Sequence, residues 1–193
     1  MRIMDLHAMP LAYSNLDLNK QHQKQMNSFI KNELTNIGRV RSNVGGYQSD
    51  NLDVLKDPFL NLLKDIIEER ANIFVRDVMQ IEKNVALGNM WLNVNGYKDY
   101  NHSHVHPHSI ISGAFYCQIP KENSGPIRFN VNKDIAVYVE ADLINNFNKY
   151  NSSVYDVFPK TFDMLLFPSW LWHEVRPNMN KKEKRITISF NCQ

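Results

Sequence analysis

Cysteines, long apolar runs and an excess of either charge are scarce in this sequence, and each shortage excludes a class of protein. Only two cysteines occur among the 193 residues, Cys117 and Cys192, which excludes the disulfide framework typical of small secreted domains. No stretch approaches the ~20 apolar residues of a membrane-spanning helix, and the first residues lack the apolar core of a signal peptide. We therefore expect a soluble, cytoplasmic protein that does not enter a membrane.

The charges are nearly balanced. The 22 Lys and Arg residues face 20 Asp and Glu residues, which leaves a formal net charge of +2. A basic run at residues 181–185 is interrupted by Glu183, a composition typical of a solvated turn between strands. A nucleic-acid-binding domain usually presents a wider basic face, so we expect no nucleic-acid partner.

The apolar residues change their spacing near the middle of the chain. Over residues 15–37 and 58–83 they recur at helical intervals. After residue 84, short runs typical of strands follow at 85–94, 110–119, 127–131, 135–139, 164–167 and 186–190. This order predicts an α+β, mainly β fold with helices packed on an antiparallel sandwich or barrel. We expect one domain over residues 1–193, helical in about 15–83 and β in about 84–193, and a homodimer would be ordinary at this size.

The histidines are the residues whose placement is most informative. Four of the seven alternate over residues 102–108, and His173 follows much later. An extended strand sends alternate side chains to one face, so two histidines at i and i+2 can reach one metal ion. A strand that returns from far along the chain can bring the third ligand, as in open catalytic sites, and imidazole suits Fe, Zn, Cu and Ni. The sequence therefore predicts a metal site.

The spacing leaves the ligand pair open. The candidate pairs are His102 with His104, His104 with His106, and His106 with His108. Pro107 lacks an N–H, so the strand ends or bulges there and His108 is the least favoured ligand. Asp99, in the preceding loop, is a weaker candidate for a carboxylate ligand.

A second chemical signal lies twelve residues after His173. Arg185, Thr187 and Ser189 alternate with apolar residues and therefore share one face of a predicted strand. An arginine held in this way, with a hydroxyl two residues on, can bind a carboxylate through a charge-assisted bidentate pair and one further hydrogen bond.

Several segments in a fixed order carry a family resemblance. They are residues 100–107 (YNHSHVHP), 111–116 (ISGAFY), 124–126 (SGP), 166–178 (LFPSWLWHEVRPN) and 185–191 (RITISFN), with 45–49 (GGYQS) before them. From about Trp91 to the end, the chain resembles a family of 2-oxoglutarate/Fe(II)-dependent oxygenases of the prolyl-hydroxylase-like superfamily, whose members are mostly bacterial and phage proteins. The order of the segments is more specific than any one of them.

The resemblance implies a double-stranded β-helix, the cupin-like jelly-roll, with Fe(II) at its open mouth and 2-oxoglutarate as cosubstrate. It implies that His104, His106 and His173 bind the metal. It also implies that Arg185, helped by Thr187, binds the distal carboxylate of 2-oxoglutarate.

Further contacts to the cosubstrate are expected from the strands that lead into and out of this site. By the same resemblance, the hydroxyls of Tyr116 and Ser112 would point toward 2-oxoglutarate. Asn93 would line the pocket, together with Trp91 on the same face of its strand.

One departure from the superfamily pattern widens the functional hypotheses. The pattern has Asp or Glu where this chain has His106. The first hypothesis is a dioxygenase that hydroxylates an unidentified substrate and releases succinate and CO2. The all-histidine set favours an alternative, a jelly-roll metalloenzyme that does not use 2-oxoglutarate. A third hypothesis is a non-catalytic module in which His102 completes a closed tetrahedral zinc site.

Overall fold

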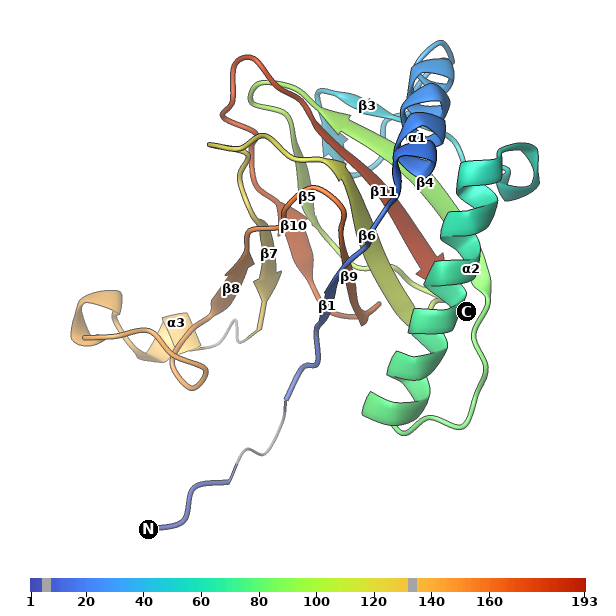
Figure 1. The fold of residues 1–193 in the computed structure, drawn as a ribbon. Coiled ribbons are helices and arrows are strands. Elements are labelled where there is room, and N and C mark those ends of the chain that lie inside the picture. Colours follow the sequence, from blue (N-terminus) through green and yellow to red (C-terminus); the bar gives the residue numbers. More distant parts are fainter. Residues whose placement is uncertain (5–7, 132–134) are drawn as a thin grey trace.

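Two antiparallel sheets face each other in the computed structural model, which describes residues 1–4, 8–131 and 135–193 (Figure 1). The larger sheet has six strands in the order β1 (Ala12–Asn15), β9 (Asp163–Pro168), β6 (Ile111–Gln118), β11 (Arg185–Cys192), β4 (Leu87–Asn95) and β3 (Tyr47–Gln48). Its register places Thr187 of β11 between Asn93 of β4 and Tyr116 of β6. Because partners opposite each other share a face, three of the predicted site residues lie in one row across this sheet.

The smaller sheet carries the histidines. Its five strands follow the order β2 (Asn43–Val44), β5 (Tyr100–His104), β10 (His173–Val175), β7 (Ile127–Asn130) and β8 (Val154–Val157). In the β5–β10 pair His173 lies directly opposite His104. The pairing therefore joins two histidines that are 69 positions apart in the sequence.

Two helices cover the outer face of the six-stranded sheet (Figure 1). Helix α1 (Lys20–Glu33) begins at Asn19 and α2 (Pro58–Ile73) at Asp57, and each of these side chains accepts hydrogen bonds from the first free backbone N–H groups. The buried face of α2 packs on the sheet through residues such as Phe59, whose ring lies 6.3 Å from that of Phe115. No helix within the described residues is both long and apolar enough to cross a membrane.

The second helix is shorter than the predicted 58–83. After Ile73 it passes through one π-helical segment, Phe74–Val78, and ends. The side chain of Asn72 then pairs with the backbone of Val85, as both donor and acceptor, at 2.8 and 2.9 Å. This pairing folds the chain back along the helix and leads it into β4, so the apolar residues beyond 78 line a return loop.

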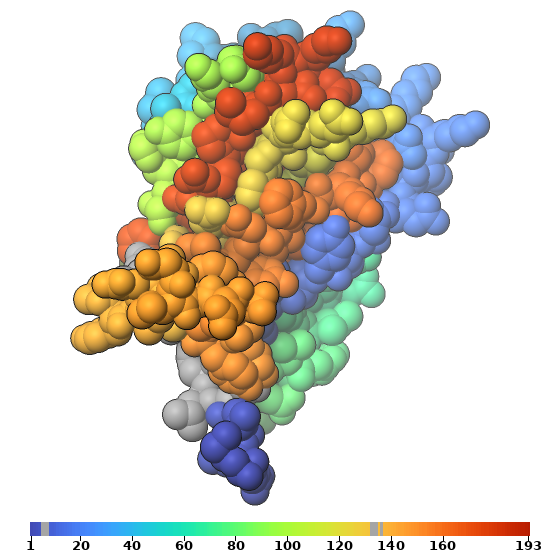
Figure 2. Space-filling view, turned by 90° about the vertical axis from the view of Figure 1, so that its left-hand side faces the viewer, coloured from blue at the N-terminus to red at the C-terminus, as the bar shows by residue number. Residues whose placement is uncertain are grey.

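The prediction of a strand at residues 135–139 is wrong. This segment forms the short helix α3 (Ile135–Tyr138), followed by the 3-10 turn Ala141–Leu143. Figures 1 and 2 show it, in light orange, standing away from both sheets. Without a neighbouring strand the backbone satisfies itself locally, with Val139 N–H donating to Ile135 O at 2.9 Å.

The protein buries two apolar clusters, one on each side of the six-stranded sheet. The larger lies between the sheet and the helices, and the smaller lies between the two sheets, around Tyr116, Phe129, Leu165 and Phe167. The predicted α+β, mainly β jelly-roll with N-terminal helices is confirmed. The space between the sheets, next to the smaller cluster, is where the candidate site lies.

Candidate metal centre

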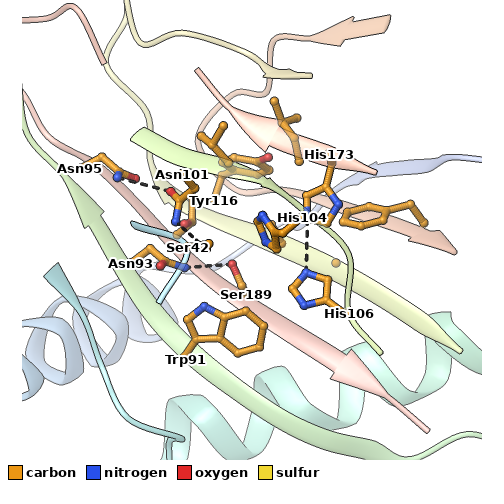
Figure 3. A pocket seen from close by; sticks show the side chains of 16 residues that line it. Ser42, Trp91, Asn93, Asn95, Asn101, His104, His106, Tyr116, His173 and Ser189 are labelled. Carbon is orange, nitrogen blue, oxygen red and sulfur yellow. Dashed lines mark hydrogen bonds between the residues drawn. The ribbon is translucent and has the colours of Figure 1, made fainter. Parts of the chain in front are cut away.

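Three of the histidines converge at one end of the space between the sheets (Figure 3). His104 ends β5, His106 follows two residues later, and His173 begins β10. Each offers a ring nitrogen, and these nitrogens lie within 4.8 Å of one another. Nε2 of His106 and Nε2 of His173 are 3.3 Å apart. The three imidazoles therefore form a group that can hold a metal ion.

Backbone carbonyls determine the tautomer of two of these rings. His104 Nδ1 donates to the carbonyl oxygen of His102 at 2.5 Å, and His173 Nδ1 donates to that of Leu171 at 2.9 Å. Because a carbonyl can only accept, the proton sits on Nδ1 and the lone pair on Nε2. Hydrogen bonds of this kind orient the ring and leave the other nitrogen ready for a metal.

Burial keeps all three rings neutral at physiological pH. Desolvation lowers the pKa of His173 to about 3 and that of His106 to about 4, and it also lowers the pKa of His104. Neighbouring imidazoles act in the same direction, because each disfavours a positive charge on the next. Neutral imidazole is the form that binds metals.

The structure distinguishes the ligand pairs that spacing left open. His102 is exposed and packs edge-on against the ring of Tyr100, with centroids 5.2 Å apart. His108 is exposed in a turn with φ of 67°. Asp99 accepts from the Gly96 N–H at 2.7 Å and thus closes its own loop. His104 and His106 are the pair that joins His173, and His102 does not complete a tetrahedral set with them.

A pocket opens beside the three histidines and runs between the two sheets (Figure 3). Most of the residues that line it are polar and uncharged, including Asn93, Asn95, Asn101, Ser42 and Ser189, and apolar or aromatic side chains such as Trp91 and Phe167 lie among them. The indole of Trp91 lies 5.6 Å from the His106 ring, centroid to centroid. Among the described residues that line this pocket there is no Asp, Glu, Lys or Arg.

Three of the side chains expected to contact a cosubstrate line this pocket, namely Asn93, Tyr116 and Thr187. Ser112 lies elsewhere. It is fully buried, and its hydroxyl is shared between Ser169 Oγ at 2.8 Å and Asn191 Oδ1 at 2.7 Å. The carbonyl of Ser169 accepts from the His106 N–H at 2.9 Å. Ser112 is therefore placed to support the loops that carry the histidines.

Arg185 is buried behind the pocket wall, with 1% of its surface exposed. Its Nη1 donates to the carbonyls of Ser124 and Gly125 at 2.6 and 3.2 Å, and its Nη2 donates to that of Arg176 at 3.0 Å. The remaining nitrogen, Nε, is buried without a hydrogen-bond partner. The guanidinium is thus held by three carbonyls and keeps its Nε–H as a free donor.

This guanidinium is also a buried charge without a direct salt bridge. Within the described part of the chain Arg185 forms no ion pair, and the Asp99 carboxylate acts on it only at longer range, where it raises the pKa of the guanidinium. Burial lowers its pKa to about 10, which still leaves it cationic at neutral pH. Because an unpaired buried charge is strongly unfavourable, the arrangement favours the binding of an anion.

The turn that presents the Ser124 and Gly125 carbonyls to Arg185 requires a glycine at position 125. Gly125 has a φ of 70°, and a Cβ there would collide with the carbonyl oxygen of Pro177. Only glycine fits a turn that brings two carbonyls onto Nη1 of Arg185.

Sequence reasoning missed three polar residues of the pocket, Ser42, Asn95 and Asn101. Asn95 shares strand parity with Trp91 and Asn93, so the signal for it was present. Ser42 and Asn101 belong to the β2–β5 edge, whose two-residue strand β2 has no sequence signature.

Comparison with known proteins agrees with this geometry. Residues 89–191, more than half of the chain, match the family described as "Putative 2OG-Fe(II) oxygenase". No curated protein matches the sequence.

Solved structures share the fold at low sequence identity. A prolyl-4-hydroxylase from Pseudomonas putida has a TM-score of 0.66 at 11% identity, over 95% of this chain and 92% of that one. HygX from Streptomyces hygroscopicus, with nickel and 2-oxoglutarate bound, has a TM-score of 0.66 at 12% identity, over 95% and 82%. A viral collagen prolyl hydroxylase from Paramecium bursaria Chlorella virus-1 has a TM-score of 0.60 at 12% identity, over 94% of each chain.

Proposed function

Because the chain belongs to the 2OG-Fe(II) oxygenase family, an oxidoreductase family that uses Fe(II) and 2-oxoglutarate, we propose that it hydroxylates a substrate and releases succinate and CO2. One observation carries the proposal. A group of three neutral, converging imidazoles lines the pocket, and a buried guanidinium without an ion pair acts electrostatically on Tyr116 of the same lining. A metal ion and a dicarboxylate are the ligands that this pair of features fits.

The histidine group fits an iron ion in its donor chemistry. Nε2 lone pairs of His104 and His173 face the group, and imidazole is a good ligand for iron. Three protein ligands leave further positions open for other ligands. Since none of the three is a carboxylate, the protein leaves the full charge of the ion to be balanced by a dianionic cosubstrate.

Arg185, Tyr116 and Thr187 are the residues that we assign to the distal carboxylate of 2-oxoglutarate. The unpartnered Nε–H of Arg185 supplies a charged donor. Burial raises the pKa of Tyr116, so its phenol keeps the proton that it would donate. The three carbonyls on Nη1 and Nη2 hold the guanidinium in place before the ligand arrives, which lowers the entropy lost on binding. HygX, which shares this fold, has 2-oxoglutarate bound, and this supports 2-oxoglutarate as the cosubstrate.

When both are bound, Fe(II) and 2-oxoglutarate supply a reaction in which dioxygen oxidises a substrate C–H bond to an alcohol while 2-oxoglutarate becomes succinate and CO2. The residues of the chain contribute by orienting the bound metal ion and 2-oxoglutarate and by excluding water from the site. Phe167 and Phe129 pack against the His173 ring, with centroids 4.7 and 6.1 Å away, and shield it from solvent. A dry site keeps the oxidant from side reactions.

The proposal is tested by anaerobic titration of the metal-free protein with Fe(II) and then 2-oxoglutarate, followed through the weak visible charge-transfer band of the chelate. We expect a band that saturates, and that His173→Ala abolishes. His102→Ala is the matched control, because it removes an exposed histidine from β5, the strand that pairs with β10, and should leave the band unchanged. Iron binding without a band, in the presence of 2-oxoglutarate, would contradict the cosubstrate assignment.

The all-histidine group favours one second candidate, a jelly-roll metalloenzyme that binds its substrate directly and does not use 2-oxoglutarate. Oxygen consumption measured with and without 2-oxoglutarate separates the two. Turnover that is independent of 2-oxoglutarate and insensitive to Arg185→Lys would support this candidate over the dioxygenase.

A further inference from the structure

We propose that the amide-rich wall of the pocket, centred on Asn93, binds an uncharged part of the substrate that carries an N–H or O–H donor. A carboxamide or a sugar-type hydroxyl has this chemistry. The inference rests on the proposed function, since it takes the metal ion and 2-oxoglutarate to lie at the histidines and Arg185. It goes further by assigning a substrate class and a residue that selects it.

The Asn93 side chain has one buried acceptor to spare. Its Nδ2 donates to Ser189 Oγ at 3.0 Å, which holds the amide in one orientation. Its Oδ1 is buried and has no hydrogen-bond partner, in a residue that lines the pocket and is only 5% exposed. Because buried polar atoms in native proteins are almost always paired, the free Oδ1 indicates a ligand that brings a donor.

The cosubstrate does not meet this requirement. At neutral pH 2-oxoglutarate is a dianion, and its carboxylate and keto oxygens only accept hydrogen bonds. It cannot satisfy Asn93 Oδ1, which is also an acceptor. The donor must therefore come from the substrate, and this moves Asn93 from the cosubstrate set to the substrate set.

The neighbouring side chains extend the same neutral surface. Asn95 Nδ2 donates to Asn101 Oδ1 at 3.5 Å, and Asn101 Nδ2 donates to Ser42 Oγ at 3.2 Å. Figure 3 shows these residues on the side of the pocket away from the histidines. They offer amide and hydroxyl groups and no formal charge.

The absence of charge on the lining points the same way. A divalent iron, a dianionic cosubstrate and the cationic Arg185 sum to one positive charge, but Arg185 is not part of the lining, whose three imidazoles are neutral and whose described residues include no charged side chain. A charged substrate group would lose its hydration and find no counter-charge in the lining. An uncharged donor loses less hydration free energy and gains the hydrogen bond to Asn93 Oδ1.

Trp91 connects this wall to the reacting end of the site. It shares strand parity with Asn93, and its indole lies between that residue and His106 (Figure 3). Its flat face offers an apolar platform for the carbon skeleton that carries the hydrogen-bonded group. A substrate held by Asn93 and packed on Trp91 therefore has its neighbouring carbon atoms directed toward the histidines.

The proposal is tested by binding rather than turnover, with protein loaded with Ni(II) and 2-oxoglutarate, which does not react. Loading is first verified by calorimetry. Saturation-transfer NMR then compares two matched sets of probes, propionamide with propionate and propylammonium, and methyl glucoside with glucuronate and glucosamine. We expect the neutral member of one set to bind about tenfold more tightly than its charged partners. The set that shows this preference distinguishes an amide from a hydroxyl substrate.

Two variants test whether the preference for neutral probes depends on Asn93. Asn93→Leu should weaken the neutral probe about tenfold, because the acceptor is lost. Asn93→Asp keeps the shape and an acceptor but adds a negative charge, so it should shift the preference to the ammonium member. Asn27→Asp, an exposed position on α1, is the control for the charge change alone and should have no effect.

Each other outcome overturns a defined part of the proposal. Charged probes that bind as tightly as neutral ones, no binding by any probe, or an unchanged profile in both Asn93 variants would each overturn the substrate class. Failure to load Ni(II) and 2-oxoglutarate would overturn the proposed function and this inference with it, and the calorimetry identifies that case before any probe is added.

Discussion

The outer and inner faces of the six-stranded sheet are built from the same strands but bury different side chains. On β11, Ile188 and Phe190 point outward into the core beneath the helices, and both are fully buried. The alternate residues Arg185 and Thr187 point inward and are also buried, at 1% and 8% exposure. The outer face is stabilised by apolar contacts that need no ligand, whereas the inner face keeps polar atoms such as Arg185 Nε and Asn93 Oδ1 without partners. The comparison shows that the outer face stabilises the fold, whereas the inner face keeps hydrogen-bonding atoms available for ligands.

The largest expected effect is on stability, from a change on the outer face. Phe115→Ala removes a fully buried ring that packs against Phe59 of α2. We expect the free energy of unfolding to fall by about 3–5 kcal/mol, measured by chemical denaturation. Tyr155→Ala is the control, because that ring is 60% exposed and its loss should change stability by about 0.5 kcal/mol or less. Equal losses in both variants would contradict the assignment of the main core to the helix-covered face.

On the inner face the largest effect should be on ligand binding. Arg185→Lys keeps the positive charge but loses the planar set of donors that is held by Ser124, Gly125 and Arg176. We expect the affinity for 2-oxoglutarate to fall about 100-fold, with metal affinity unchanged, both measured by calorimetry. Unchanged 2-oxoglutarate affinity would remove Arg185 from the cosubstrate site.

The buried histidines of the inner face should make the free energy of unfolding depend on pH, whereas the apolar outer face should not. Burial lowers the pKa of His106 to about 4 and of His173 to about 3, from an ordinary value of 6.5. Below about pH 6.5 the unfolded chain takes up protons that the folded chain does not, so the free energy of unfolding of the metal-free protein should decrease from pH 6.5 toward pH 3–4. Denaturation curves at a series of pH values measure this loss.

The variant His106→Gln should flatten that pH dependence, because it removes one of the groups that titrates on unfolding. His102→Gln, at an exposed position outside the group, serves as its control. A pH dependence that is the same in the His106 variant and the parent would contradict the effect of burial on this ring.

The smallest expected effect is that of a single inner hydroxyl. Thr187→Val is close in shape and removes one hydrogen bond to the cosubstrate carboxylate, worth about 1.5 kcal/mol. We expect the affinity for 2-oxoglutarate to fall about tenfold while the free energy of unfolding changes little. A large loss of stability would show that Thr187 belongs to the core rather than to the site.

Local patterns anticipated the elements that bury a regular face. The helical spacing predicted α1 and the first part of α2, and alternation predicted β4, β6, β7, β9 and β11 within a few residues. The failures lie where tertiary contacts override local pattern. The segment at 135–139 has strand-like composition but no strand to pair with among the described residues. The apolar spacing past Val78 predicts helix, but the Asn72 side chain ties the chain back to Val85. The short strands β1, β2, β8 and β10 depend on their neighbours and have no strong signature of their own.

The sequence by itself determined the chemistry that is present: histidines at alternate positions, a distant His173, and Arg185 with Thr187 on one strand face. These follow from covalent order and from the two-residue period of a strand. Only the tertiary structure decided which histidines meet, because β5 pairs with β10 so that His104 faces His173 while His102 turns to Tyr100. It also decided that Ser112 supports the loops, that Arg185 is held by three carbonyls, and that Asn93 retains a free acceptor. Such relations join residues far apart in the chain, and local spacing carries no information about them.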